Sequence, residues 1–389
     1  MRNVFCWLCG LALVAGLSLS ASSAWTQTKP ADNGGGLVEW TAPAAPRPLP
    51  QTPAQEEIGK TKGRPLPAPE LLQPTLDPAL PIYHARGDLH LAGTFKVSAS
   101  DVLPDLVRRW IAGFERDYPL VHLKLSPPFA GSLGAVALAK GKIDAAFVSR
   151  ELRPSDITLF QAHYGYKPLS VPVSGGSYRQ FGFLDAVVFV VNQHNPIGQL
   201  SFDQLDRILS STHGRGGEAI TSWGQLGLTG EWADRPIHIY GIKPWNGFEE
   251  FVRQRVLSAD GNRGEWRDGI AFAKAVFPIA DEVAKDPDGI GYTGMAFVDA
   301  PVKLLALQAE AGKPYYSPTY ENVASADYPL SRLIYLNLNR APGKKLAPAL
   351  QQFLLYILSR QGQQAVLDQA IYLPLRAGQV DDSRKLIEP

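Results

Sequence analysis

Cysteine and net charge are both scarce in this sequence of 389 residues. Its only cysteines, Cys6 and Cys9, lie near the start, and 38 basic residues stand against 37 acidic ones. The rest of the chain therefore has no disulfide and no thiolate metal site. A chain so close to neutrality is not typical of proteins that cover nucleic acid or anionic membranes, because those surfaces need clustered Lys and Arg.

Signatures of catalysis are also missing. The seven histidines show no H-E-x-x-H spacing, and the sequence contains neither a G-x-S-x-G elbow nor a phosphate-cradling P-loop. The glycine-rich stretch at 214–217 does not stand between a predicted strand and a predicted helix, so we interpret it as a loop. We expect no enzyme activity, no catalytic residue, no metal and no cofactor; a hydrolase is the least supported function.

The longest apolar run of the chain lies at its beginning. Arg2, the apolar residues 4–17 and the small residues 18–24 have the three-part form of a secretory signal peptide, with cleavage expected after Ala24. A membrane-spanning helix is the alternative, but the run is shorter than the ~20 residues that a span needs. The predicted location is therefore periplasmic or secreted.

Residues 25–86 form a proline-rich arm, with twelve prolines between Pro30 and Pro81. Proline removes a backbone donor and favours extended geometry in the residue before it. We expect a stiff, mostly solvated and mostly irregular linker. The alternative is a polyproline ligand for a partner domain.

From residue 87 onward, strand-like and helix-like segments alternate. A strand over 89–98, a helix over 101–114, a strand over 121–125, a helix from 132 and a strand over 145–148 give a β-α-β-α-β order. This order predicts an α/β fold with mixed, mostly parallel sheets and helices on both faces.

A second α/β unit is inserted into the first. It contains the most apolar strand, over 183–191, and a helix that starts at the capping box of Ser201 and Gln204. We assign 87–185 and 301–389 to the first lobe and 186–300 to the second lobe.

Three junctions between a turn and a helix start have the same form. Each would present free backbone N–H groups and the positive end of a helix dipole, which suit an anion. Ordinary helix capping is the alternative for each of them. The junctions are Ser100-Asp101, Gly131-Ser132 and Asn246-Gly247.

Charged and aromatic side chains lie next to these junctions. Ser149 and Arg150 follow a buried strand, so we predict that Arg150 faces a ligand; a structural ion pair is the alternative. Lys243 and Trp245 precede the third junction and are predicted to line a cleft, although a lone tryptophan can simply be packed.

The order and spacing of several short motifs over residues 88–376 resemble the periplasmic phosphate-binding proteins of phosphate ABC transporters, within the type II solute-binding fold. The motifs are Ala99-Ser100-Asp101, Gly131-Ser132, the stretch 139–144, Val148-Ser149-Arg150, Val191-Asn192, Asn195-Pro196, and the stretches 220–223, 289–292, 328–332 and 358–363.

The resemblance implies two lobes joined by two crossing strands, with a small anionic ligand, phosphate or a related oxyanion, held between them. It also implies an inner-membrane permease as a partner; we further expect a monomer and no nucleic-acid partner. Members of the family carry an arginine and a Ser-Gly-Thr turn in the second lobe. Here Asn246 and Phe248 occupy the serine and threonine positions, and Lys243 is the nearest cation to the arginine position.

Two functions follow from these observations. The first is a solute-binding protein that closes on the anion for uptake by an ABC transporter. The second is a non-transport interaction or sensory protein that keeps the fold but has lost tight phosphate binding. The replacements at Asn246 and Phe248, together with the arm, motivate this second function.

Overall fold

The structure is a computed structural model that describes residues 47–48, 53–66, 70–71, 75–180, 182–244 and 246–387. All of them belong to one unit, Glu39–Pro389. The predicted leader over 1–24, most of the segment 25–52 and Trp245 lie outside the described residues. Within the described residues, no helix is both long enough and apolar enough to cross a membrane.

The first lobe is built on a five-stranded sheet of order β4-β3-β5-β14-β6. β3 is parallel to β4 and β5, whereas β14 is antiparallel to β5 and β6, so the sheet is mixed as predicted. The strands are β3 (Gly93–Ala99), β4 (Val121–Leu125), β5 (Ala145–Val148), β6 (Leu169–Gly175) and β14 (Leu333–Leu338).

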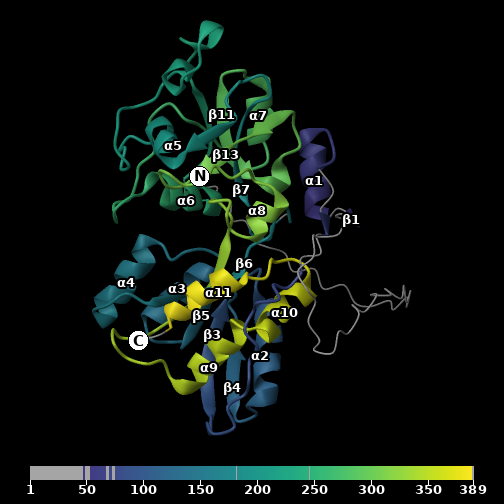
Figure 1. Ribbon diagram of the computed structural model, residues 1–389, viewed down its shortest axis with the longest axis vertical. Coiled ribbons are helices and arrows are strands. Elements are labelled where there is room, and N and C mark those ends of the chain that lie inside the picture. The colour runs from purple at the N-terminus through teal and green to yellow at the C-terminus, as the bar shows by residue number, and fades with distance from the viewer. Residues whose placement is uncertain are drawn as a thin grey trace, which may run out of the picture. The chain divides into compact units, whose positions relative to one another are not determined.

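Helices cover both faces of this sheet, and β5 shows how. Its residues alternate in direction: Phe147 stacks on Trp110 with ring centroids 5.5 Å apart, while Ala146 and Val148 pack in a separate cluster with Phe160. The helices of this lobe are α2 (Pro104–Asp117), α3 (Gly131–Ala139), α4 (Pro154–Tyr164), α9 (Pro348–Ile357), α10 (Arg360–Gln369) and α11 (Ala377–Lys385). α2, α9 and α10 contact one another, and α3 contacts α4 (Figure 1).

The second lobe contains a five-stranded sheet of order β10-β9-β11-β7-β12 and a two-stranded sheet of β13 and β8. The strands are β7 (Val187–Asn192), β8 (Gln199–Ser201), β9 (His238–Ile242), β10 (Ala271–Ala273), β11 (Gly289–Gly294), β12 (Val302–Leu304) and β13 (Ala306–Gln308). Its α-helices are α5 (Phe202–Leu209), α6 (Gly247–Val252), α7 (Ile279–Lys285) and α8 (Tyr320–Ala324). A π-helical turn, Arg253–Leu257, continues α6.

The second lobe extends past the predicted boundary at residue 300. β12 pairs with β7 and β13 pairs with β8, and Tyr328 and Leu330 are buried in the same core as β7. The chain therefore re-enters the first lobe with β14. Sequence alone suggested an earlier return because short strands at a sheet edge carry little periodicity.

The two connections between the lobes run side by side. The backbone N–H of Gly176, after β6, donates to the carbonyl of Arg332 at 2.6 Å. The backbone N–H of Val187 donates to the carbonyl of Leu330 at 3.2 Å. Paired crossing segments of this kind were implied by the family resemblance. They place Arg332, which directly precedes β14, at the junction of the lobes.

Some described segments of the arm contact the folded part, in addition to the solvated, irregular linker that was predicted. Residues Pro53–Lys62 form helix α1 (Figure 1). Lys62 Nζ lies 2.9 Å from Asp281 of the second lobe and 2.6 Å from Asp299. Leu80 is buried, and the carbonyl of Pro81 accepts the N–H of Arg360 in the first lobe at 2.8 Å. Proline content indicated the extended stretches but could not indicate these distant ion pairs and contacts.

Candidate ligand-binding site

Three of the predicted site residues meet where β3 and β5 end. Ser100 directly follows β3, and its Oγ accepts the backbone N–H of Ser149, which directly follows β5, at 3.1 Å. Gly131 begins α3, and a Cβ there would lie 2.4 Å from Ser100 Oγ, so only glycine fits beside this serine. These segments therefore converge at one edge of the sheet.

The start of α3 is not capped by a side chain, so the capping alternative for Gly131-Ser132 does not apply. The N-cap is Ala130, and Ser132 lies exposed within the first turn. The first N–H groups of α3 are therefore not occupied by a capping hydroxyl. An anion placed at this helix start would meet free donors.

Asp101 does not start a helix. Helix α2 begins at Pro104, three residues later, and its N-cap is Leu103 without a side-chain cap. Proline suits the first helical position because the N–H that it lacks would have no intrahelical partner. The Asp101 side chain is exposed and accepts only the N–H of Val102, at 3.1 Å, among the hydrogen bonds of the described residues.

Arg150 forms the ion pair that was the alternative to a ligand contact. Its Nη1 lies 2.9 Å from Asp156 Oδ2 and 2.8 Å from the carbonyl of Glu151. Its Nη2 is buried and has no hydrogen-bond partner among the described residues. The guanidinium is thus fixed through one nitrogen and keeps the other for a further acceptor.

The predicted residues of the second lobe are less closely grouped. Asn246 caps α6, with its Oδ1 accepting the N–H of Phe248 at 2.9 Å. Gly247 is exposed, and a Cβ there would contact nothing within 4 Å. Lys243 is also exposed, and its side chain makes no contact with Asn246 or Gly247 in the described hydrogen bonds.

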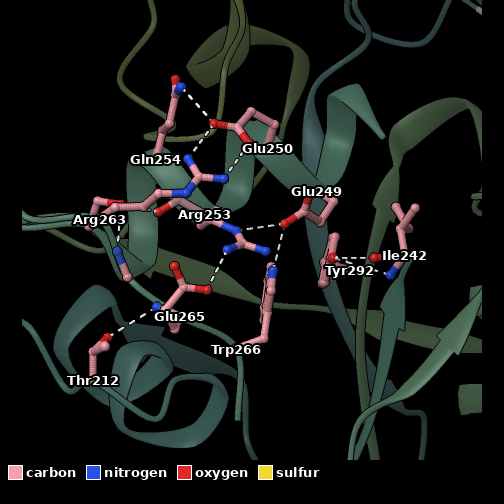
Figure 2. Close-up of polar contacts among 12 residues, drawn as sticks. Thr212, Ile242, Glu249, Glu250, Arg253, Gln254, Arg263, Glu265, Trp266 and Tyr292 are labelled. Carbon is pink, nitrogen blue, oxygen red and sulfur yellow. Dashed lines mark hydrogen bonds and ion pairs between the residues drawn. The ribbon is translucent and has the colours of Figure 1, made fainter. Parts of the chain in front are cut away.

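Two carboxylates in the first turn of α6 would repel an anion, but each of them forms an ion pair with an arginine (Figure 2). Arg253 Nε donates to Glu249 at 2.7 Å, and Trp266 Nε1 donates to the same oxygen at 2.6 Å. The fork of Arg263 holds Glu250 through two bonds of 2.7 Å, and this contact lowers the pKa of Glu250. The negative charge at the start of α6 is therefore offset within the lobe.

Arg332 is a cation between the lobes that the sequence analysis did not place in the site. Its Cζ lies 5.3 Å from the ring centroids of both Phe248 and Phe251, which belong to α6. None of its side-chain nitrogens is hydrogen-bonded within the part of the chain that the structure describes, and its Nε is buried. Burial lowers the pKa of Arg332, and the nearby carboxylates of Asp185 and Glu151 oppose that shift.

Asp185 is a buried carboxylate close to this arginine. Its Oδ2 accepts the backbone N–H of Ala296 at 2.9 Å, and burial raises the pKa of the Asp185 carboxyl to about 6. A Cβ on Gly294 would lie 2.3 Å from that oxygen and 2.8 Å from the ring of Phe248. Asp185, Gly294 and Phe248 are therefore packed too closely for a larger residue at 294.

One ion pair joins the two lobes directly. Glu151, next to Arg150, lies 3.2 Å from Arg255 Nη1 of the π-helical turn. The hydroxyl of Tyr335, on β14, donates to the same carboxylate at 3.0 Å. Burial raises the pKa of Tyr335 above its usual range, so the hydroxyl stays protonated and remains a donor.

A signal for Arg332 was present in the sequence. Arg150 was singled out because it adjoins an apolar strand, and Arg332 has the same relation to the apolar strand 333–338, at its other end. Because β14 runs antiparallel to β5, the residue before β14 reaches the same sheet edge as the residues after β5. The strand direction, which the sequence did not provide, was the missing information.

A possible metal-binding group among the described residues consists of His238, Asp286 and Asp288. Asp286 Oδ2 already contacts His238 Nδ1 and the Tyr240 hydroxyl, both at 2.8 Å, and Asp288 pairs with Arg235 at 2.5 Å. These contacts use the oxygens that a cation would need. The group therefore serves the packing of β9 and β11.

The architecture is that of a two-lobe solute-binding protein, and comparison with known proteins supports this class. Residues 85–361 match the family model of the PBP superfamily domain. The chain is 33% identical over 304 residues to the phosphate-binding protein PstS of Pseudomonas aeruginosa, which covers 78% of this chain and 88% of that protein. The chain therefore belongs to the PBP superfamily and, within it, to the family of phosphate-binding proteins.

Other similarities are weaker. The chain is 33% identical over 129 residues to the phosphate-binding protein PstS 2 of Streptococcus agalactiae, which covers 32% of this chain and 41% of that protein. The crystal structure of PstS from Borrelia burgdorferi aligns with 73% of this chain and 99% of its own, at 16% identity and a TM-score of 0.49.

Proposed function

We propose that this protein binds phosphate or a closely related tetrahedral oxyanion between its lobes. The observation that carries the proposal is the convergence of Ser100, Gly131 and Ser149 at one sheet edge, beside a helix start without a side-chain cap. Neutral N–H and hydroxyl donors at a helix N-terminus are a general means of holding such an anion. Arg150 adds a guanidinium nitrogen that has no other partner among the described residues.

We further propose that the protein is exported to the periplasm and delivers its ligand to an inner-membrane ABC permease. The predicted leader over 1–24 and the membership of the phosphate-binding family support this role. The relatives are named as binding proteins, and no catalytic step is part of the proposal.

Isothermal titration of the purified protein with phosphate, arsenate and sulfate tests the ligand class. A ligand at about 100 times its dissociation constant should also stabilise the protein by about 2.7 kcal/mol, which a thermal-shift assay detects. The absence of both heat and stabilisation for all three anions would remove the proposal.

The second candidate is an interaction or sensory protein of the same fold, because Phe248 places a ring where the family has a hydroxyl. Titration also separates the two candidates. Millimolar or absent phosphate binding, combined with retention of envelope proteins on the immobilised chain, would favour the second candidate.

A further inference from the structure

The proposed anion site lacks a cation from the second lobe. The family's arginine before the Ser-Gly-Thr turn is absent from residues 241–248, and Lys243 is exposed and makes no contact with Asn246 or Gly247. A dianion taken out of water needs hydrogen bonds and opposite charge on most of its oxygens. Arg150 alone would leave the side of the ligand that faces the second lobe without positive charge.

Arg332 lies at the edge of the sheet where the first-lobe donors converge. β14 pairs with β5 up to Tyr335 opposite Val148. Arg332 lies three residues before Tyr335, on the side of the sheet where Ser149 and Arg150 follow β5. Arg332 therefore lies at the same sheet edge as the donors of the first lobe, and its guanidinium lies against two rings of α6.

Two aromatic rings lie close to the guanidinium of Arg332 and leave its N–H groups unused. The rings of Phe248 and Phe251 each lie 5.3 Å from Cζ, a distance at which aromatic rings attract a guanidinium. No described residue accepts a hydrogen bond from its nitrogens. Arg332 is partly buried, and its Nε is buried without an acceptor, so a group that supplied an acceptor would stabilise it.

Competing carboxylates are already engaged elsewhere. Glu249 and Glu250 pair with Arg253 and Arg263 (Figure 2), and Glu151 lies 3.2 Å from Arg255. Asp185 accepts the N–H of Ala296 and forms no ion pair with Arg332 within the described contacts. Among the described residues, the guanidinium of Arg332 thus has no carboxylate as an ion-pair partner.

We propose that the guanidinium of Arg332 binds two oxygens of the tetrahedral oxyanion and replaces the arginine that other family members carry in the second lobe. This assignment rests on the proposed function. In it, Phe248 is not a lost donor but one of the two rings that hold the arginine in place. The fork geometry suits phosphate and arsenate, because two parallel N–H groups match two oxygens of one tetrahedral group.

The test compares three proteins by titration with phosphate. Arg332→Met keeps the contact with the two rings but removes the charge and all donors, and should bind phosphate at least about 100-fold more weakly. Arg332→Lys keeps the charge without the fork, and about a 10-fold loss is expected. Arg109→Met removes an exposed arginine that pairs with Asp105 on α2 and should leave affinity unchanged.

Melting temperatures without phosphate show whether each variant is folded. Folded Arg332→Met or Arg332→Lys with an affinity within threefold of the unchanged protein would overturn the assignment. If the unchanged protein binds none of the anions, the proposed function fails, and the assignment fails with it. Binding by the unchanged protein together with normal binding by the variants defeats the assignment alone.

A measurement on the unchanged protein does not depend on the folding of any variant. Phenylglyoxal modifies accessible arginines, and peptide mass mapping gives the rate at each site. Saturating phosphate should slow modification of Arg332 at least about 10-fold if the anion occupies its N–H groups, and should leave Arg109 unaffected. Equal rates at Arg332 with and without phosphate would contradict the proposal.

Discussion

The two sides of the candidate site are built from different chemistry. On the first lobe, Ser100, Gly131 and Ser149 meet through a neutral hydrogen bond and a close backbone approach. On the second lobe, the corresponding helix start is surrounded by ion pairs, with Glu249 and Glu250 held by arginines of the same lobe (Figure 2). The structure of the first side depends on close packing around a hydrogen bond, and the structure of the second side depends on the balance of its charges.

This difference has a physical consequence for substitutions. Loss of a neutral hydrogen bond changes the free energy by about 1 kcal/mol, whereas loss of one partner from a buried ion pair leaves an uncompensated charge and costs about 3–5 kcal/mol. We therefore expect stability to be most sensitive on the second lobe. Ligand affinity should be most sensitive to the geometry of the first lobe and to the cation between the lobes.

The largest effect on stability is expected for Glu249→Ala. The side chain of Glu249 is 1% exposed and accepts from both Arg253 and Trp266, so its removal leaves two buried donors with poorer partners. We expect a loss of about 3 kcal/mol or more in the free energy of unfolding. Urea denaturation without ligand measures this loss, because the midpoint of the variant should lie below that of the unchanged protein.

Glu282→Ala is the matched control for that variant. Glu282 also belongs to the second lobe, but it forms an exposed pair with Lys285 across one helical turn. Its loss should change stability by less than about 0.5 kcal/mol. Equal midpoints for the two variants would show that the buried pair does not dominate the second lobe.

The next effect concerns pH and Asp185. Burial raises the pKa of this carboxyl to about 6, above its value in the unfolded chain, so the native state holds the proton more tightly. The contribution of Asp185 is then most favourable below pH ~4 and is lost as the pH rises through about 6, by up to ~3 kcal/mol.

Asp185→Asn isolates this contribution, because the amide oxygen can still accept the N–H of Ala296. Above pH 7 the variant should be more stable than the unchanged protein, and near pH 4 the difference should shrink. Arg263 lowers the pKa of Glu250, so the contribution of Glu250 to stability is lost as the pH falls. This contribution is the same in both proteins and cancels in their difference. Urea midpoints that stay parallel over this pH range would refute the prediction.

The third effect contrasts the two glycines of the site. A Cβ at Gly131 would lie 2.4 Å from Ser100 Oγ, so Gly131→Ala must rotate or displace that serine and break its bond to Ser149. We expect phosphate affinity to fall about 10-fold, which corresponds to ~1.4 kcal/mol. Titration of the variant measures it.

Gly247→Ala tests the same substitution at the start of α6 in the second lobe. A Cβ there contacts nothing within 4 Å, and this glycine does not adopt a positive φ, so the apo melting temperature should not fall. A clear fall in the melting temperature of Gly247→Ala would contradict the open surroundings of this glycine.

Sequence patterns predicted the parts of this architecture that depend on local chemistry. The apolar run 145–148 is a buried strand, and the capping box of Ser201 and Gln204 is present with both reciprocal bonds. Ser149 and Arg150 were expected to follow a buried strand, and both follow β5. The helix start predicted at Ser100-Asp101 was wrong because α2 begins at Pro104.

Other features depend on contacts between distant segments, which periodicity does not encode. Arg332 reaches the site only because β14 pairs antiparallel with β5, more than 180 positions earlier in the chain. Lys62 looked like part of a solvated arm, yet its ammonium is held by Asp281 and Asp299. In both cases the composition near the residue indicated nothing about the partner.

The smallest effect is expected for Ser100→Ala. Its hydroxyl accepts the N–H of Ser149 at 3.1 Å, and the variant leaves that N–H to water or to the ligand. We expect phosphate affinity to fall about fivefold, which corresponds to ~1 kcal/mol, because one neutral hydrogen bond is lost while the backbone path is kept. Thr94→Ala, at an exposed position of the same strand β3, is the control and should bind normally. If Ser100→Ala lost as much affinity as Gly131→Ala, the hydroxyl itself and not the shape of the edge would hold the ligand, because a direct contact with the anion is worth more than a bond to a neighbouring amide.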